Sequence, residues 1–246
     1  MSLSPLKAAA LGAAALMLAA CGEEPVESSD AAPAADQAET PAVNPVSGDA
    51  AISAVPLRAA SQDDPFVQAG YAVGDIVLGD PNAPVTLIEY ASLTCPHCAD
   101  FHNDSLPTIK DEYVDAGKVR LVVREVYFDQ FGLFASAISR CGGEQRFHAY
   151  LDVFFKQQSQ WIGDGNPESI LEEIRRIGRF GGLSEERVNA CLDDQPFLNQ
   201  LLQNYQAAAE ADGVQSTPFF LVNGEPVRGN VGLDQMRAVI DSKLGG

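Results

Sequence analysis

The chain has 246 residues, of which 46% are hydrophobic, and this size suits one globular domain with additional segments. Its formal net charge is −18. This excess of acidic residues argues against a nucleic-acid partner, because nucleic acids bind to basic protein surfaces. The cysteines number five, and this odd count needs an explanation.

Residues 1–20 predict an export signal. Lys7 supplies a positive charge, and the apolar run over residues 8–20 has the length of a signal peptide and is too short to span a bilayer comfortably. The run ends in Leu18-Ala19-Ala20-Cys21, which resembles a bacterial lipobox. We therefore expect lipid attachment at Cys21 and a membrane-anchored protein of the periplasm or cell envelope. The alternatives are an ordinary signal peptide with an incidental cysteine and an uncleaved anchor.

Residues 21–66 predict the lipidated cysteine and a disordered linker after it. The stretch 22–66 holds six prolines and many Ala, Glu, Asp and Ser residues, without a sustained apolar period. A segment of this composition cannot bury enough surface to offset its ordering entropy. We expect the linker to hold a folded domain, residues 67–246, some distance from the lipid anchor.

The beginning of the domain predicts a strand, a helix and a strand. Residues 75–78 are a short strand candidate, and the β-rich apolar run 85–90 is typical of a buried central strand. Residues 99–116 have helical spacing, with a kink expected at Pro107. Residues 119–126 predict the next strand. A parallel β-α-β unit is the simplest arrangement of these elements.

The following stretch predicts a helical insertion over about 131–212, after which strands return. The candidate helices are 131–140, 144–158, 168–180, 184–192 and 196–211. Residues 218–222 and 225–228 then predict two strands joined by a hairpin turn at Asn223-Gly224. Residues 233–244 predict a closing amphipathic helix.

The motif Cys95-Pro96-His97-Cys98 stands where the central strand gives way to a helix. A helix N-terminus has unpaired amide donors and a partial positive charge, so we expect it to stabilise a thiolate on Cys95. Pro96 suits the first helical position because it has no amide proton, and His97 can donate to the thiolate. A stabilised thiolate makes the disulfide oxidising. Cys98, one turn further on, is placed to resolve a mixed disulfide on Cys95.

The cysteine motif has three alternative interpretations. A structural zinc site needs two more ligands at matching spacing, and a c-type haem site needs a histidine where this chain has Ala99. A plain structural disulfide is a further alternative, although neighbouring cysteines at a helix start close a small ring that suits a redox couple better. We therefore predict no metal ion and no cofactor.

These residues resemble the DsbA family of thiol:disulfide oxidoreductases over about residues 70–246. Glu89 matches the buried acid that the family has beneath its active site, and the resemblance implies that it accepts the proton of Cys98. Ser216-Thr217-Pro218 looks like the family's cis-proline loop, which faces the reactive cysteine. The helical stretch resembles the insertion that separates DsbA from thioredoxin. The implied architecture is an α/β thioredoxin fold with a helical insertion, preceded by the signal peptide and linker.

The resemblance implies an enzyme that introduces disulfide bonds into unfolded or thiol-bearing exported polypeptides and is reoxidised by a membrane redox partner. Thr217 departs from the best-known oxidase of the family, which has valine there, and matches the disulfide isomerases. An isomerase or reductase kept reduced by a partner is therefore the alternative. Those isomerases carry an N-terminal dimerisation domain where this chain has a linker, so we expect a monomer and favour the oxidase. A non-enzymatic envelope chaperone is a third hypothesis.

Cys141 and Cys191 are expected to form a second, structural disulfide. Some DsbA relatives with helical insertions carry such a bridge. Lipidation of Cys21 would leave four cysteines, which is an even number, and export would place them in an oxidising compartment. Two free buried thiols are the alternative. His102 and His148 are predicted to be core or surface residues rather than metal ligands.

Overall fold

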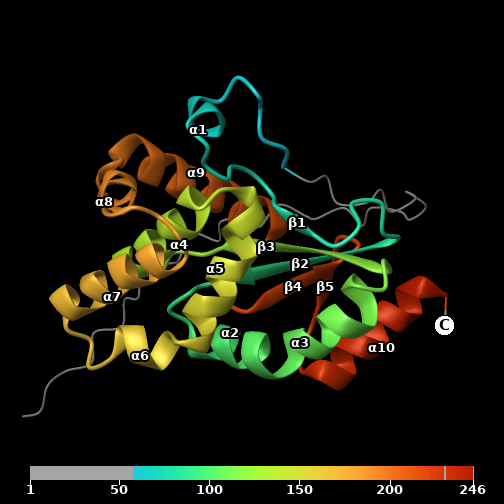
Figure 1. The fold of residues 1–246 in the computed structure, drawn as a ribbon. Coiled ribbons are helices and arrows are strands. Elements are labelled where there is room, and N and C mark those ends of the chain that lie inside the picture. Colours follow the sequence, from blue (N-terminus) through green and yellow to red (C-terminus); the bar gives the residue numbers. More distant parts are fainter. Residues whose placement is uncertain (1–57, 230, 246) are drawn as a thin grey trace, which may run out of the picture. The chain divides into compact units, whose positions relative to one another are not determined.

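A computed structural model describes residues 58–229 and 231–245 of the chain (Figure 1). The predicted signal peptide, Cys21 and most of the predicted linker lie outside these residues. Within the described ranges, no helix has the length and apolar character that crossing a membrane requires.

The elements follow the predicted order along the chain. The helices are α1 (Pro65–Gln68), α2 (Pro96–Asp100), α3 (Leu106–Ile109), α4 (Gln130–Cys141), α5 (Glu144–Lys156), α6 (Gln158–Ile162), α7 (Pro167–Phe180), α8 (Glu185–Asp193), α9 (Gln195–Asp212) and α10 (Leu233–Leu244), with π-helical turns η1 (Phe101–Ser105) and η2 (Lys110–Val114). The strands are β1 (Val77–Leu78), β2 (Val85–Ala91), β3 (Val119–Glu125), β4 (Phe219–Val222) and β5 (Glu225–Val227).

The strands form one sheet in the order β1-β3-β2-β4-β5. β2 and β3 are parallel and in register from Val85 opposite Val119 to Ala91 opposite Glu125, which confirms the predicted β-α-β unit. β1 pairs with β3, β4 with β2 and β5 with β4, all antiparallel. Every residue of β2 is buried, because helices cover this central strand on both faces.

Side chains along β2 alternate between two cores. Leu87 belongs to the same large apolar cluster as Cys98, whereas Ile88 belongs to a smaller cluster with Ala208 of α9. Successive residues of a strand point to opposite faces of the sheet. Glu89 therefore lies on the face that carries Leu87 and the helix of the cysteine motif.

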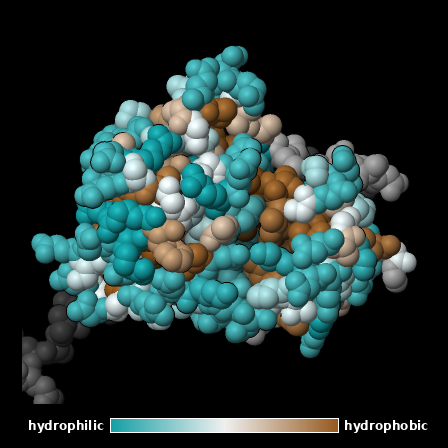
Figure 2. Space-filling view, viewed as in Figure 1, coloured by the Kyte–Doolittle hydropathy of each residue, from teal (hydrophilic) through white to brown (hydrophobic). Residues whose placement is uncertain are grey.

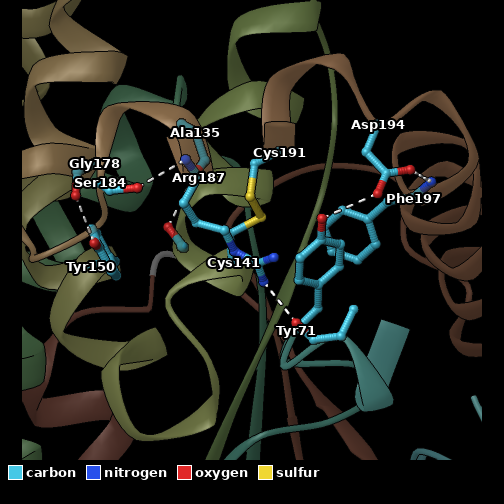
Figure 3. Close-up of a disulfide and its surroundings, with 12 residues drawn as sticks. Tyr71, Ala135, Cys141, Tyr150, Gly178, Ser184, Arg187, Cys191, Asp194 and Phe197 are labelled. Atoms are coloured by element: carbon cyan, nitrogen blue, oxygen red, sulfur yellow. Dashed lines mark hydrogen bonds between the residues drawn. A yellow bond between two sulfur atoms is a disulfide. The ribbon is translucent and has the colours of Figure 1, made fainter. Parts of the chain in front are cut away.

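Helices α4–α9 lie between β3 and β4 in the chain. Most of them lie beyond one end of the sheet, at the left of Figure 1. A disulfide between Cys141 and Cys191 ties α4 to α8, with Cα atoms 6.4 Å apart and both residues buried (Figure 3). Nearby, the Tyr150 hydroxyl donates to the Gly178 carbonyl at 2.9 Å and so joins α5 to α7. The insertion is thus cross-linked around its own core.

The described fold starts earlier than residue 67, the predicted beginning of the domain. The Arg58 amide donates to an Asp75 carboxylate oxygen at 2.8 Å, and the Asp75 amide donates to the Arg58 carbonyl at 2.8 Å. Asp64 then caps α1 by accepting from the Phe66 amide. The Arg58–Asp75 pair spans 17 residues, and the local composition, rich in proline and small polar residues, does not predict it.

Two helix predictions were wrong in detail. The helix begins at Pro96, as the cysteine motif predicted, but the stretch expected to be helical over 99–116 alternates α2, η1, α3 and η2 and ends at Val114. Pro107, which cannot donate a backbone hydrogen bond, is the second residue of α3. The helix expected over 144–158 ends at Lys156, and α6 begins at Gln158. The break turns the side chain of Gln158 into the protein, where it is buried.

Candidate active site

The two cysteines of the motif lie at the carboxyl end of β2 in different surroundings. Cys95 is the N-cap residue of α2, in an extended conformation, and Pro96 lies in the first turn. Cys95 is partly exposed, whereas Cys98 is fully buried, and both are free thiols. A substrate sulfur can therefore reach Cys95 but not Cys98.

Burial sets the chemistry of the second thiol. It raises the pKa of Cys98 well above that of an ordinary cysteine, and the negative charges of Glu89 and Cys95 raise the pKa further. Cys98 is consequently a thiol at neutral pH. It needs a base before it can attack a disulfide, because the thiolate is the nucleophile.

The loop before β4 lies against Cys95. The Thr217–Pro218 peptide bond is cis, and the Cys95 thiol donates to the Thr217 carbonyl across 3.7 Å. These residues are 122 positions apart in the chain. The pairing of β4 with β2 brings them together, since Phe219 lies opposite Tyr90 in that ladder.

Glu89 lies beneath the cysteines and is fully buried. One of its oxygens, Oε2, is 2.9 Å from Nε2 of His102. The other, Oε1, is also buried and has no hydrogen-bond partner among the described residues. The structure therefore brings together Cys98, Glu89 and His102.

Sequence reasoning did not find the link between His102 and Glu89. The side chain of His102 is 3% exposed, and its ring stacks on Phe155 of α5 with centroids 3.8 Å apart. The available signal was spacing, because residues four apart share one face of a helix. His102 follows Cys98 by four positions in a continuous helical segment and so faces the sheet with it.

His97 points outward. Its side chain is 81% exposed, and Nδ1 is 3.7 Å from an Asp100 carboxylate oxygen. Within the described ranges no hydrogen bond joins His97 to Cys95. His97 instead forms one wall of a groove of about 370 Å³ whose other lining residues include Asp104, Pro218 and Val231.

The helical insertion holds the cysteine loop at two points. The Gln158 side-chain amide donates to the carbonyls of Leu93 and Cys95, both at 2.9 Å. The Thr94 hydroxyl donates to the Asp129 carboxylate at 2.6 Å, and Asp129 also caps the start of α4. Gln158 and Asp129 escaped the sequence analysis because nothing local distinguishes them from other polar residues.

The remaining histidine, His148, lies on α5. Its Nε2 donates to the Ile76 carbonyl at 3.1 Å, and burial lowers its pKa to about 4. No group of three or more His, Cys, Asp or Glu side chains in the described part of the chain is arranged to hold a metal ion.

A family model described as thioredoxin matches residues 71–242. A Rickettsia bellii protein named as a protein-disulfide oxidoreductase is 33% identical over 171 residues, which cover 69% of this chain and 64% of that protein. The match thus spans less than two thirds of that relative's length.

Solved structures of thiol:disulfide exchange proteins are also similar to this chain. α-DsbA1 from Wolbachia pipientis is 30% identical, with a TM-score of 0.63 over 70% of this chain and 91% of that one. A protein-disulfide isomerase from Novosphingobium aromaticivorans is 25% identical, with a TM-score of 0.63 over 71% of this chain and 100% of that one. The region covered by the family model includes the cysteine motif, Glu89, the insertion and the Thr217–Pro218 loop.

Proposed function

Because this chain belongs to the thioredoxin family and is DsbA-like, we propose that Cys95 and Cys98 form a redox pair that exchanges disulfides with thiol-bearing polypeptides. The predicted thioredoxin fold with a helical insertion is confirmed. The observation that carries the proposal is the asymmetry of the pair. An accessible thiol at a helix start lies beside a buried thiol, and a carboxylate lies close enough to the buried thiol to raise its pKa.

The reaction begins with the pair oxidised. A substrate thiolate attacks the sulfur of Cys95, a bond forms between these two sulfurs, and Cys98 leaves as a thiolate that takes up a proton. A second substrate thiolate then attacks the substrate sulfur of the mixed disulfide, and Cys95 leaves as a thiolate. The substrate gains a disulfide, and the protein holds the two electrons until a membrane redox partner removes them.

The finer proposal is that the protein is an oxidase, with Pro96, His97, Thr217 and Pro218 framing the reactive sulfur. An isomerase or reductase kept reduced by a partner is the second candidate. It is favoured by the identity of Thr217, since the disulfide isomerases have threonine at this position, and by the name of the Novosphingobium relative. The two differ in the direction of electron flow, so the resting redox state of the pair separates them.

The test is the reduction potential of the Cys95–Cys98 pair. The exported protein is equilibrated in glutathione buffers, its thiols are alkylated, and the modified fraction is measured by mass spectrometry. We expect a potential nearer about −120 mV than about −270 mV, and an oxidised pair in the cell. A potential near the lower value, with a reduced pair in the cell, would transfer the assignment to the reductase or isomerase.

The proposal includes export and anchoring. Cys21 lies outside the described residues, and the lipobox-like sequence before it supports lipid attachment there. We expect a mature protein that begins at a lipidated Cys21 and sediments with membranes, and a Cys21→Ala variant that is released from them. The intact mass of the purified protein and its distribution after fractionation check this.

A further inference from the structure

We propose that His102 is the positioning residue that makes Glu89 the base for Cys98, by holding one oxygen of its carboxylate and leaving the other free for the thiol proton. This inference rests on the proposed redox function of the cysteines, and it adds a residue to which the sequence assigned no role.

The strand β2 and the cysteine helix bring Glu89, Cys98 and His102 close together. Glu89 lies on the face of β2 toward the cysteine helix, and Cys98 and His102 are one turn apart on that helix. Glu89 is hydrogen-bonded to His102 at 2.9 Å, and its charge also raises the pKa of Cys98. One carboxylate thus binds the imidazole and is close enough to the thiol to act on it through its charge.

The hydrogen bonds of the His102 ring nitrogens indicate which nitrogen carries the proton. Nε2 of His102 is the ring nitrogen that faces Glu89, whereas Nδ1 is buried without a hydrogen-bond partner among the described residues. A buried N–H without a partner is costly, so the proton belongs on Nε2, where it donates to Oε2. Oε1 then keeps its lone pairs. A buried polar atom without a partner calls for an explanation, and proton uptake from Cys98 supplies one.

Several titratable side chains surround His102. His102 is one of the residues that line a groove of about 260 Å³, together with residues of α3, η2 and α5. The face of the molecule shown in Figure 2 is largely hydrophilic. The titratable groups near it are Glu89 from β2, Cys98 from α2, Lys110 and Asp111 from η2, and His148, Asp152 and Lys156 from α5. Lys110 and Asp152 pair with each other at 3.2 Å. Among the described residues, Glu89 is the group that hydrogen-bonds the His102 ring.

The chemical step is a proton transfer coupled to an exchange. When Cys95 carries a mixed disulfide, the Cys98 thiol gives its proton to Oε1 of Glu89. The Cys98 thiolate attacks the sulfur of Cys95, a Cys95–Cys98 bond forms, and the sulfur of the bound molecule leaves as a thiolate. The carboxylate becomes a carboxylic acid, and Nε2–H of His102 remains its donor throughout. Without that donor, both carboxylate oxygens of Glu89 would be buried without a hydrogen-bond partner, and nothing would hold the carboxylate in place.

The experiment separates the two thiols in time. The reduced full-length protein is mixed with one equivalent of 5,5′-dithiobis(2-nitrobenzoate) in a stopped-flow instrument between pH 5 and 9. Attack by Cys95 releases the first coloured thiolate, and attack by Cys98 on the mixed disulfide releases the second. A Cys95→Ser variant measures the signal from other thiols, which is subtracted.

Two substitutions at one position distinguish positioning from packing. In His102→Leu we expect the second phase to slow at least about tenfold at pH 7 and to move to higher pH, because positioned proton transfer contributes about 10²–10⁴-fold. His102→Gln places an amide donor where Nε2 stands, and we expect a rate within about twofold of the wild type. His148→Gln is the matched control for loss of a buried histidine, and the first phase should be unchanged in all three variants.

A His102→Leu protein with the wild-type second phase and pH profile, or a His102→Gln protein as slow as His102→Leu, would overturn the inference. Absence of the first phase in the wild type would instead contradict the proposed function. Should the variants not fold, ¹⁵N spectra of the wild-type imidazoles decide. The chain has three histidines, and we expect the neutral His102 ring to carry its proton on Nε2, whereas a neutral ring with its proton on Nδ1 would contradict the assignment.

Discussion

At the scale of single residues, the active site is a set of groups that one helix and one strand place at different depths. Cys95 is accessible at the helix start, Cys98 is buried one turn later, and His102 follows after another turn. Glu89 meets them from the strand below. This difference in depth supports the proposed roles, in which the accessible sulfur meets the substrate and the buried sulfur needs a base.

Replacing each thiol separately tests these roles. We expect Cys95→Ser to abolish disulfide exchange, because the remaining thiol is out of reach. We expect Cys98→Ser to form mixed disulfides through Cys95 that are not resolved, which non-reducing electrophoresis and mass spectrometry would detect. An active Cys95→Ser protein would show that the mechanism is wrong.

His148 makes the stability of the protein depend on pH. Burial lowers its pKa to about 4 in the folded state, whereas an unfolded histidine has a pKa near about 6.5. Below pH 6.5 the unfolded state binds the extra proton first, so stability falls as the pH falls from about 6.5 toward about 4. We expect this group to remove about 1–2 kcal/mol between pH 7 and pH 5.

The measurement is chemical denaturation of the wild type and of His148→Gln at several pH values. The variant keeps a donor for the Ile76 carbonyl but does not titrate, so its free energy of unfolding should fall less over this range. Equal slopes for the two proteins would contradict the assignment.

At the scale of elements, the helical insertion supports the active site as well as lying beside it. α6 sends Gln158 to two carbonyls of the cysteine loop, and the start of α4 holds Thr94 through Asp129. The loop between β2 and α2 is thus fixed by segments that follow it by more than thirty residues. This explains why α5 is broken before Gln158 rather than continuing as the single helix that the periodicity predicted.

Removal of the Gln158 amide should loosen this loop. Gln158→Leu leaves the Leu93 and Cys95 carbonyls without this donor, and we expect a loss of about 1–3 kcal/mol of stability with faster amide hydrogen exchange over residues 92–99. Gln160→Leu, at an exposed position of the same helix, is the matched control. A Gln158→Leu protein with unchanged exchange in the loop would refute the supporting role.

The disulfide of the insertion is a second element-scale prediction. Cys141 and Cys191 are 50 residues apart, and closing a loop of that length stabilises a fold by about 4 kcal/mol in the chain-entropy model. A Cys141→Ala/Cys191→Ala protein should therefore unfold at lower denaturant concentration and yet exchange disulfides through Cys95. Unchanged stability would mean that the bridge contributes nothing to the fold.

At the scale of the whole molecule, charge is the dominant property. The net charge is −18, and the groove beside His97 is lined by Asp100 and Asp104. A field of one sign raises the local concentration of oppositely charged partners and accelerates their encounter. We therefore expect the acidity of the protein to favour the encounter of basic polypeptide segments with Cys95.

We expect a cysteine peptide rich in Lys and Arg to react about tenfold faster than an acidic one at low salt, with the difference disappearing near 1 M salt. Stopped-flow rates with the two peptides at several salt concentrations test this. Asp100→Asn/Asp104→Asn should reduce the preference while leaving the reaction with a neutral peptide unchanged. Equal rates for the two peptides at low salt would show that the field does not select substrates.

Local signals in the sequence predict the order and type of most elements and point to the proposed redox pair. Apolar runs of strand length, helical spacing over 131–212 and turn residues at Asn223-Gly224 are local signals, and the strands β2 and β3 and the helix α10 were predicted nearly to the residue. The Cys95–Cys98 motif is equally local. These features depend on neighbours in the chain, so periodicity and composition suffice to find them.

Tertiary structure alone decided which distant groups meet. The Thr217 carbonyl lies against Cys95 because β4 pairs with β2, Gln158 reaches the cysteine loop because α5 breaks, and Arg58 joins the fold because Asp75 accepts from its amide. The partnership of Glu89 and His102 needs a strand and a helix packed face to face. Such contacts depend on how elements pack in three dimensions. The spacing of Cys98 and His102 indicates that they share a helix face, but it does not indicate which strand that face packs against.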